Sequence, residues 1–450
     1  MPWLDLPAAP SFWLRDARVA AGFLAAPVPG APIDTEGVVR LDLRISGGQI
    51  ADLAPAGSAE DGVDLDGGQV WPGLIDAHVH LDKTQIWSRS ANPDGTHAGA
   101  RAASTADRTH WDEADIRGRF EFGLACAYAH GTVAMRTHID SYWPQAQIGW
   151  RVFRALRDAL AGRIELQASS ICPLGQFAGL DGAALADEVA NSGGVLGMST
   201  TGIGDPDWPV IASLQDQLDR FFTLAEERDL ALDLHIDETG DTRARMLHAV
   251  AATALRRNFR RPIQCGHCCA LALQPAEFAA ETIRLCAETG IAIVSLPMCN
   301  MYLQGRAPGQ TPRWRGVTLA HEFAASGVPV SFASDNCRDP FYAYGDYDLI
   351  EVYREAVRIA HLDHPFGLWP RSVGATPARS PGFRASRHDP GRRHGRPDPV
   401  PRPVHDRIAG ASAERPRGFA GRPGDRRGAA RLSPARSPTG AIDGGSGRRF

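Results

Sequence analysis

The chain has 450 residues, and 43% of them are hydrophobic. It can therefore bury the core of one large domain and of a smaller partner domain, and it is too long to be a small binding module. No apolar run of about eighteen residues and no basic-then-apolar leader occurs, so we expect a cytoplasmic protein without a membrane partner. The formal net charge of -4 divides into +10 for residues 381–450, which hold sixteen Arg against six acidic residues, and -14 for the rest.

The first 70 residues form the first predicted unit. Short apolar runs alternate there with Gly, Pro and Asp, a pattern typical of short antiparallel strands. We therefore predict that residues 1–70 form a small β domain.

Residues 71–375 form the second predicted unit, in which apolar strands alternate with amphipathic segments. This alternation is typical of repeated β/α units with a parallel sheet, so the predicted fold class is α/β. Eight strands are predicted, the number that closes a TIM-type (β/α)8 barrel. They lie at residues 70–80, 131–140, 163–173, 193–205, 230–238, 262–269, 290–298 and 329–336.

Residues 376–450 form the third predicted unit, a tail rich in Arg, Pro and Gly. Lys83 is the single lysine of the chain, which indicates GC-rich coding DNA, and an out-of-frame stretch of such DNA translates into these residue types. We therefore expect the tail to be disordered or the product of a frameshift near residue 380. Its charge is compatible with nucleic acid binding, but its scarcity of aromatic residues and its irregular spacing argue against that partner.

Histidine and acidic side chains follow the predicted strands at their C-terminal ends, where barrel enzymes place their active sites. His78 and His80 lie two residues apart in one strand, so both side chains point to the same face. His235 and Asp335 follow the fifth and eighth strands. The four residues are a ligand set suited to one divalent metal ion, Zn(II) or Fe(II), with room for a water whose pKa the ion would lower to about 7.

Two further residues at strand ends are candidates for proton transfer. Glu238 follows His235 by three residues and can turn back over the water, although a carboxylate in the first turn of a helix is an alternative. His267 ends the sixth strand and can stabilise the transition state, although a buried structural histidine is an alternative. A lone CxxC in a strand is weak evidence for redox or zinc chemistry, so we interpret Cys265 and Cys268 as packing residues and all eight cysteines as free thiols.

Three other residues carry further expectations. His138 and Asp140, in RTHID, either orient the metal ligands or, in the case of Asp140, contact the substrate. Lys83 stands in a chain that otherwise uses arginine, which indicates a need for a compact ammonium group. We expect it to pair with a carboxylate or to contact the substrate. The alternative is that this lysine has been retained by chance and has no specific role.

These motifs resemble the cytosine deaminase group of the amidohydrolase superfamily over about residues 10–375. The resemblance is carried by PGLIDAHVHLDKT, RTHID, LHIDE, the GH of CGHCC, LQGR with RWRG, and ASDNCRDPFYAYG. It implies a β-sandwich formed by both chain ends, a barrel between them, one Fe(II) or Zn(II), and hydrolytic deamination of a nucleobase-like ring. It places the metal on His78, His80, His235 and Asp335, and the acid/base work on Glu238 and His267.

Three features depart from that group. Asn336 stands where cytosine deaminases carry a second Asp that contacts the ring, and this neutral side chain both donates and accepts hydrogen bonds. Gln176, in ICPLGQF, is the equivalent of a glutamine that reads the ring edge, but it is shifted relative to the proline. The tail replaces the C-terminal strands of the sandwich. The expected substrate contacts are Gln176, Asn336, Lys83 and Asp140.

The leading hypothesis is a metal-dependent hydrolytic deaminase that acts on cytosine or a related nucleobase-like cyclic amidine and releases ammonia. One alternative keeps the mechanism but displaces a substituted amine from a triazine-like ring or opens a cyclic amide. Another alternative is an inactive or defective amidohydrolase-like protein. The expected partner is a small heterocyclic substrate, and the choice between a monomer and a homo-oligomer stays open.

Overall fold

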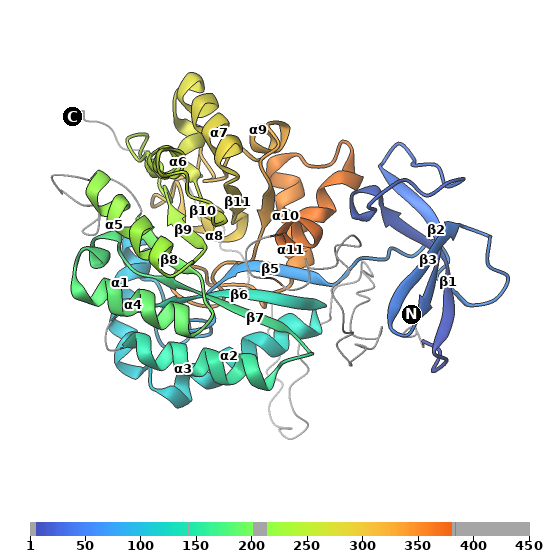
Figure 1. Cartoon of the computed structure of the whole chain (residues 1–450), viewed down its shortest axis with the longest axis horizontal. Coiled ribbons are helices and arrows are strands. Elements are labelled where there is room, and N and C mark those ends of the chain that lie inside the picture. Colours follow the sequence, from blue (N-terminus) through green and yellow to red (C-terminus); the bar gives the residue numbers. More distant parts are fainter. Residues whose placement is uncertain (1–5, 143–144, 201–213, 380–382, 384–450) are drawn as a thin grey trace, which may run out of the picture. The chain divides into compact units, whose positions relative to one another are not determined.

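The computed structural model describes residues 6–142, 145–200, 214–379 and 383, and Figure 1 traces its elements along the chain. The N-terminal sheet has the order β3-β2-β1-β4, with strands Ser11–Ala20 (β1), Val38–Ser46 (β2), Gln49–Pro55 (β3) and Val63–Asp64 (β4). The predicted antiparallel pairing is confirmed for β1 to β3. It is wrong for β4, which runs parallel to β1 because the chain crosses back before β4 begins.

All eight strands predicted after residue 70 are present. They are Leu74–Val79 (β5), Thr132–Asp140 (β6), Glu165–Ile171 (β7), Leu196–Thr200 (β8), Leu232–Ile236 (β9), Ile263–His267 (β10), Ala292–Ser295 (β11) and Val330–Phe332 (β12). They pair in parallel as two sheets, β5-β6-β7 and β8-β9-β10-β11-β12. The fold is therefore α/β with parallel sheets and a small N-terminal sheet.

Helices connect these strands. They are His97–Asp107 (α1), Glu113–Ala129 (α2), Gln145–Ala159 (α3), Leu180–Asn191 (α4), Leu214–Glu227 (α5), Met246–Arg257 (α6), Ala276–Thr289 (α7), Pro297–Leu303 (α8), Ala320–Ala325 (α9), Leu349–Ala360 (α10) and Ala375–Ala378 (α11). Short 3-10 helices occupy Ala21–Phe23, Arg108–His110, Leu174–Ala178, Cys269–Leu273 and Phe366–Val373. Capping explains several ends: the side chains of Thr96, Asp112 and Asp348 accept backbone N–H groups at the starts of α1, α2 and α10.

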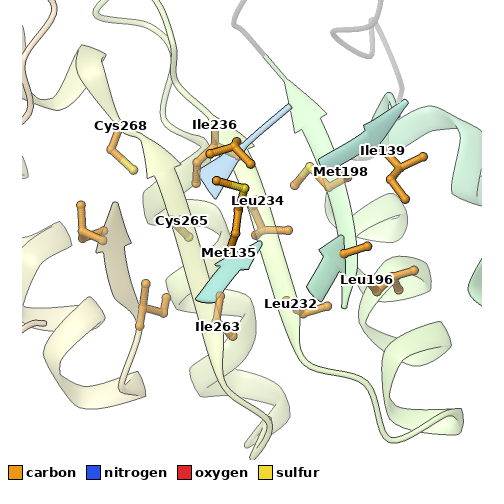
Figure 2. Packing of buried hydrophobic residues seen from close by; sticks show 14 of the residues in the cluster. Met135, Ile139, Leu196, Met198, Leu232, Leu234, Ile236, Ile263, Cys265 and Cys268 are labelled. Atoms are coloured by element: carbon orange, nitrogen blue, oxygen red, sulfur yellow. The ribbon is translucent and has the colours of Figure 1, made fainter. Parts of the chain in front are cut away.

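The strands are buried on both faces, but the two faces differ in chemistry. Leu232, Leu234 and Ile236 of β9 belong to the large apolar cluster, together with neighbours from β6, β8 and β10 (Figure 2). The alternate residues of β9, Asp233 and His235, are also buried but polar. Since side chains alternate along a strand, the packing of the helices on one face leaves the other face free to carry ionisable groups.

Little of the predicted tail lies within the described ranges. They include residues 376–379 and Phe383, whose ring packs against Ile75, Ala77 and Ala134. The expected disorder or frameshift of the remaining tail, and the C-terminal half of the sandwich, lie outside the described residues.

Two predictions drawn from composition can be compared with the structure. All eight cysteines are free, as predicted. In the ranges that the structure describes, no helix has both the length and the apolar character needed to cross a membrane.

Candidate metal centre and active site

Three site residues adopt the left-handed backbone conformation where their strands end. Asp237, His267 and Asp335, at the ends of β9, β10 and β12, have φ values of 54°, 68° and 63°. This conformation costs a non-glycine residue about 1 kcal/mol or more, and such strain concentrates at functional sites. The Asp237 carboxylate anchors one of these turns by accepting two backbone N–H groups at the start of α6.

The structure brings the four predicted metal ligands together. Nε2 of His80 lies 3.2 Å from Nε2 of His235 and 3.2 Å from Oδ1 of Asp335. Nε2 of His78 lies 3.6 Å from the same Oδ1. None of the four side chains is more than 5% exposed. They form one buried cluster of imidazole nitrogens around a carboxylate.

The donor set of this cluster fits a divalent cation. Within the described part of the chain, both nitrogens of His78, Nδ1 of His80 and His235, and both carboxylate oxygens of Asp335 are buried without a hydrogen-bond partner. Burial, followed by the charge of Glu238, raises the pKa of Asp335 well above its usual value. A bound cation would offset the free-energy cost of burying the ionised carboxylate of Asp335. Burial also lowers the pKa values of the three imidazoles well below the usual value, which favours the neutral form that binds metals.

Two neighbours define the space for the His78 ring. The ring of His138 lies 4.0 Å from it, centroid to centroid, and Nε2 of His138 faces Oδ1 of Asp233 at 3.2 Å. A Cβ atom at Gly266 would lie 2.7 Å from Cε1 of His78, so only glycine leaves room for the ring. His138 also offers a ring nitrogen within 4.8 Å of ligand atoms of His78, His80 and His235, so its role as a residue that orients a metal ligand stays a prediction.

Glu238 lies close to two imidazole rings and one side-chain amide. Its carboxylate is 3.4 Å from Nδ1 of His267 and 3.4 Å from Nε2 of His97, and it accepts a hydrogen bond of 3.1 Å from Nδ2 of Asn300. Burial acts to raise the pKa of Glu238, but the charges of His267 and His97 outweigh it and lower the pKa. Gln304 donates to the backbone carbonyl of Glu238, which holds the residue from a second side.

A pocket with a cavity volume of about 100 Å³ adjoins this cluster. Eight predicted residues line it: His80, Lys83, Asp140, His235, Glu238, His267, Asp335 and Asn336. The lining also includes residues that the sequence analysis did not assign, namely His97, Arg101, Ser104, Thr105, Arg108, Tyr142, Ile171, Ser199 and Phe341.

Lys83 and Asp140 are paired in this pocket. Nζ of Lys83 lies 2.7 Å from Oδ1 of Asp140, and Nη2 of Arg108 lies 2.8 Å from its Oδ2. Burial acts to raise the pKa of Asp140, but the two cations outweigh it and lower the pKa to about 2. The expectation that Lys83 pairs with a carboxylate is thus met.

Asn336 and Gln176 occupy different positions relative to the pocket. Asn336 lines it, and its Nδ2 donates to Oδ2 of Asp339 at 2.7 Å. Gln176 is not among the residues that line the pocket, because its Nε2 donates to the carbonyl of Ser141 at 2.9 Å. The structure therefore brings Asn336 to the site and leaves Gln176 outside it.

Most of the residues that sequence reasoning missed come from connections, whereas Ile171 and Ser199 lie in β7 and β8. Asn300 lies in α8, two residues beyond the end of the predicted strand 290–298, and a search one helical turn past each predicted strand end would have found it. His97, Arg101 and Arg108 come from the long connection after β5, where their helical spacing was the available signal. Phe341 and Tyr142 carried no signal of that kind.

Comparisons with known proteins agree with this geometry. The model of the Amidohydrolase family matches residues 163–387. A pterin deaminase of Rhizobium rhizogenes is 49% identical over 351 residues, which cover 76% of this chain and 78% of that protein. An N-isopropylammelide isopropyl amidohydrolase of Pseudomonas sp. is 24% identical over 322 residues, covering 69% and 74%. Among solved structures, the 5-methylcytosine deaminase from Klebsiella pneumoniae with 5-fluorocytosine has a TM-score of 0.69 at 22% identity, covering 82% of this chain and 86% of that chain.

Proposed function

The chain belongs to the amidohydrolase family, and from this premise we propose that it is a metal-dependent deaminase that hydrolyses the exocyclic amine of a pterin-type ring and releases ammonia. The observation that carries the proposal is the buried cluster of His78, His80, His235 and Asp335, in which Nε2 of His80 lies 3.2 Å from both His235 and Asp335 and Nε2 of His78 lies 3.6 Å from Asp335. His80, His235 and Asp335 line the pocket together with Glu238. The 49% identity to a pterin deaminase supports the choice of ring. Cytosine is the substrate expected from the sequence, but it is supported only by the structural likeness to a 5-methylcytosine deaminase at 22% identity. Pterin therefore replaces it as the proposed substrate.

The proposed scaffold for residues 71–375 is one closed (β/α)8 barrel. Residues 1–70 stay a separate β domain in this proposal, and residues 376–450 stay the tail. Isolated parallel bridges link the two sheets at both seams, Val79 with Asp335 and Ser169 with Val195. The first of these bridges sets Asp335 beside the strand that carries His78, so the closure of the barrel and the assembly of the metal site support each other.

The proposed cofactor is one Zn(II) or Fe(II) held by the four-residue cluster. When bound, such an ion lowers the pKa of a water to about 7 and supplies a nucleophile near neutral pH. The chain itself provides the positioning: the His80 and His235 rings are held by burial, and His78 by the space between His138 and Gly266.

Glu238 is the proposed proton carrier. Its lowered pKa keeps the carboxylate ionised at neutral pH, so it can accept a proton from the attacking water. It passes this proton to the ring nitrogen next to the amine-bearing carbon, and then passes the second water proton to the leaving amine. The C–N bond breaks as the C=O bond forms, and one water is consumed for each ammonia released.

His267 is the proposed donor to the oxygen that becomes the new carbonyl. Nδ2 of Asn300 lies 3.0 Å from Nδ1 of His267, and the proposal uses the tautomer in which Nδ1 accepts this hydrogen bond and Nε2 carries the proton. Nε2 is buried without a hydrogen-bond partner in the described ranges, and burial lowers the pKa of the ring. The neutral imidazole therefore keeps an N–H group for the developing oxyanion.

Asn336 is proposed to contact the ring through its side-chain oxygen. Its Nδ2 donates to Asp339, and the thiol of Cys299 lies 3.8 Å from its Oδ1. An accepting oxygen suits the N–H edge of a 2-amino-4-oxo ring. The remaining predicted contacts, Lys83 and Asp140, are retained as pocket residues.

A second candidate is the displacement of a substituted amine from a triazine ring, which the N-isopropylammelide relative supports at 24% identity. A panel of pterin, an N-alkylaminotriazine and cytosine, assayed for amine release with metal-loaded protein, separates the candidates. We expect the highest kcat/KM with pterin. Preference for the triazine would favour the second candidate, and release from neither ring would overturn both.

The alternative that the chain is a defective amidohydrolase-like protein can be tested without an activity assay. Elemental analysis and a thermal melt of the purified full chain decide it. We expect one metal ion per chain and a cooperative transition, and the absence of both would support the defective protein.

A further inference from the structure

Helix α8 presents two amide side chains to Glu238. Asn300 lies within the helix and Gln304 ends it, and residues four apart share one helical face. Nδ2 of Asn300 donates to Oε1 of Glu238 at 3.1 Å, and Nε2 of Gln304 donates to the backbone carbonyl of Glu238 at 3.0 Å. Asn300 is 1% exposed and is not among the residues that line the pocket. It therefore contacts the proposed proton carrier but not the substrate space.

The same amide nitrogen also contacts the ring of His267. Nδ2 of Asn300 lies 3.0 Å from Nδ1 of His267, and that Nδ1 lies 3.4 Å from Oε1 of Glu238, so three polar atoms form one compact group. An amide nitrogen has two N–H groups and does not accept a hydrogen bond. Asn300 can therefore donate one hydrogen to the carboxylate and the other to the ring.

The carboxylate of Glu238 determines which end of the Asn300 amide faces this group. An ionised carboxylate accepts hydrogen bonds and cannot donate them. If the amide were turned around, its oxygen would face Oε1 of Glu238, and two buried acceptors would meet without a proton between them. The NH2 end is therefore the one that faces both Glu238 and His267.

This orientation favours one tautomer of the His267 ring. A neutral imidazole has a proton on one nitrogen and a lone pair on the other. When Nδ1 accepts from Asn300, the proton is on Nε2, which is buried and has no hydrogen-bond partner within the described ranges. When the proton is on Nδ1, two donors face each other at 3.0 Å, so the contact with Asn300 disfavours this second tautomer.

We propose that Asn300 is a positioning residue, whose amide holds the carboxylate of Glu238 and keeps the proton of His267 on Nε2. The role rests on the proposed function, in which Nε2 donates to the oxygen that becomes the new carbonyl. Without the amide, the proton can move to Nδ1 and be held by the Glu238 oxygen 3.4 Å away. Nε2 then has no proton to donate to the developing oxyanion.

Nitrogen NMR of the zinc-loaded full chain with isotope-labelled histidine tests this directly, because it reports which ring nitrogen of His267 carries the proton. The His267→Gln variant identifies the signals of this ring. We expect the proton on Nε2 in the wild type and on Nδ1 in Asn300→Asp and in Asn300→Leu. The Asp variant keeps the shape and replaces the NH2 group with an acceptor, and the Leu variant removes both polar groups. The wild-type tautomer in both variants would overturn the proposal.

Steady-state kinetics separates positioning from substrate binding. In both Asn300 variants, kcat for pterin should fall about 10²-fold while KM changes less than about twofold, because Asn300 does not line the pocket. Elemental analysis should find wild-type metal content, since Asn300 is not one of the four proposed ligands. A raised KM with an unchanged kcat would mean that Asn300 acts on substrate binding and would contradict the positioning role.

The matched control is Asn191→Asp. Asn191 is an exposed residue at the end of α4 and lies outside the pocket lining. This variant should keep the wild-type tautomer of His267 and the wild-type kcat. A change equal to that of Asn300→Asp would show a general effect of added negative charge and would count against the role of Asn300.

The tautomer measurement also distinguishes this proposal from the proposed reaction, because it requires no turnover. A proton that moves to Nδ1 in the Asn300 variants of a chain that does not deaminate pterin would overturn the reaction and keep Asn300 as the residue that sets the His267 tautomer. A proton that stays on Nε2 in both variants would overturn the role of Asn300 even if the wild-type chain deaminates pterin.

Discussion

Glu238 and Asp140 are both buried carboxylates of the same pocket, but their partners differ in kind. Glu238 lies beside the imidazole rings of His267 and His97. Asp140 lies between the fixed cations Lys83 and Arg108. Titratable partners suit a proton carrier, whereas fixed cations hold a carboxylate permanently ionised. The two residues therefore lead to different predictions.

Glu238→Gln should lower kcat for pterin deamination by about 10² to 10⁴, because the amide keeps the shape but cannot carry a proton. Elemental analysis should find wild-type metal content, since Glu238 is not one of the four proposed ligands. Glu281→Gln, on an exposed part of α7, is the control and should leave kcat unchanged. A kcat for Glu238→Gln close to wild type would remove Glu238 from the mechanism.

Asp140→Asn should destabilise the protein in a pH-dependent way. The pKa of Asp140 falls from 3.8 to about 2 on folding, so the ionised side chain contributes about 2 kcal/mol of stability above pH 3.8. The contribution is lost as the pH falls from 3.8 to about 2. Urea unfolding of both proteins at pH 7 and pH 3 should show a difference that narrows at the lower pH. The exposed Asp158→Asn variant should show little difference at either pH.

The positions of single residues were predictable to different degrees. The proposed metal ligands follow from two regularities. The alternation of side chains in a strand predicts that His78 and His80 share a face, and the location of sites at the ends of parallel strands predicts that Asp335 lies near them, as their contacts show. Gln176 was expected at the substrate, but its amide is taken by the Ser141 carbonyl. That hydrogen bond depends on the path of a loop, which no periodic pattern specifies.

At the scale of elements, close contact between neighbouring strands shapes the metal site. Gly266 of β10 lies against the ring that β5 contributes through His78. Both strands were predictable from the sequence. The contact between them was not, because glycine has no side chain that would indicate it. The same holds for helix α1. The helical spacing of its polar residues is visible in the sequence, but the orientation of these residues toward the pocket is not.

Gly266→Ala should weaken metal binding by about 10- to 100-fold, because the added Cβ displaces the His78 ring by contact at 2.7 Å. Competition with a chelator of known affinity measures the effect. Gly118→Ala is the matched control, since a Cβ there meets no atom within 4 Å, and it should keep wild-type metal affinity. Equal affinities in the two variants would contradict the proposed ligand geometry.

At the scale of the whole molecule, the eight strands were predictable because each is buried on both faces and reads as an apolar run between polar connections. The order of strands within the sheets followed from the β/α alternation. The parallel pairing of β4 was not predictable, because two residues carry no direction. The expected defect of the tail stays a prediction, and Phe383, a described residue of the tail, packs against residues of β5 and β6.

Phe383→Ala should lower the stability by about 3 kcal/mol, because the ring is 1% exposed and packs against Ile75 and Ala77. Phe122→Ala, which removes an aromatic ring that is 56% exposed, is the matched control and should change stability far less. Thermal melts of both variants provide the measurement. Equal melting temperatures would mean that the chain near residue 383 does not contribute to the folded core.

The central claim, a pterin deaminase that depends on one metal ion, is tested most directly by titrating metal-free protein with Zn(II) or Fe(II) while measuring ammonia release from pterin. The account predicts that activity rises in proportion to added metal and reaches a plateau at one ion per chain. Folded protein that binds one ion and releases no ammonia from pterin would contradict it.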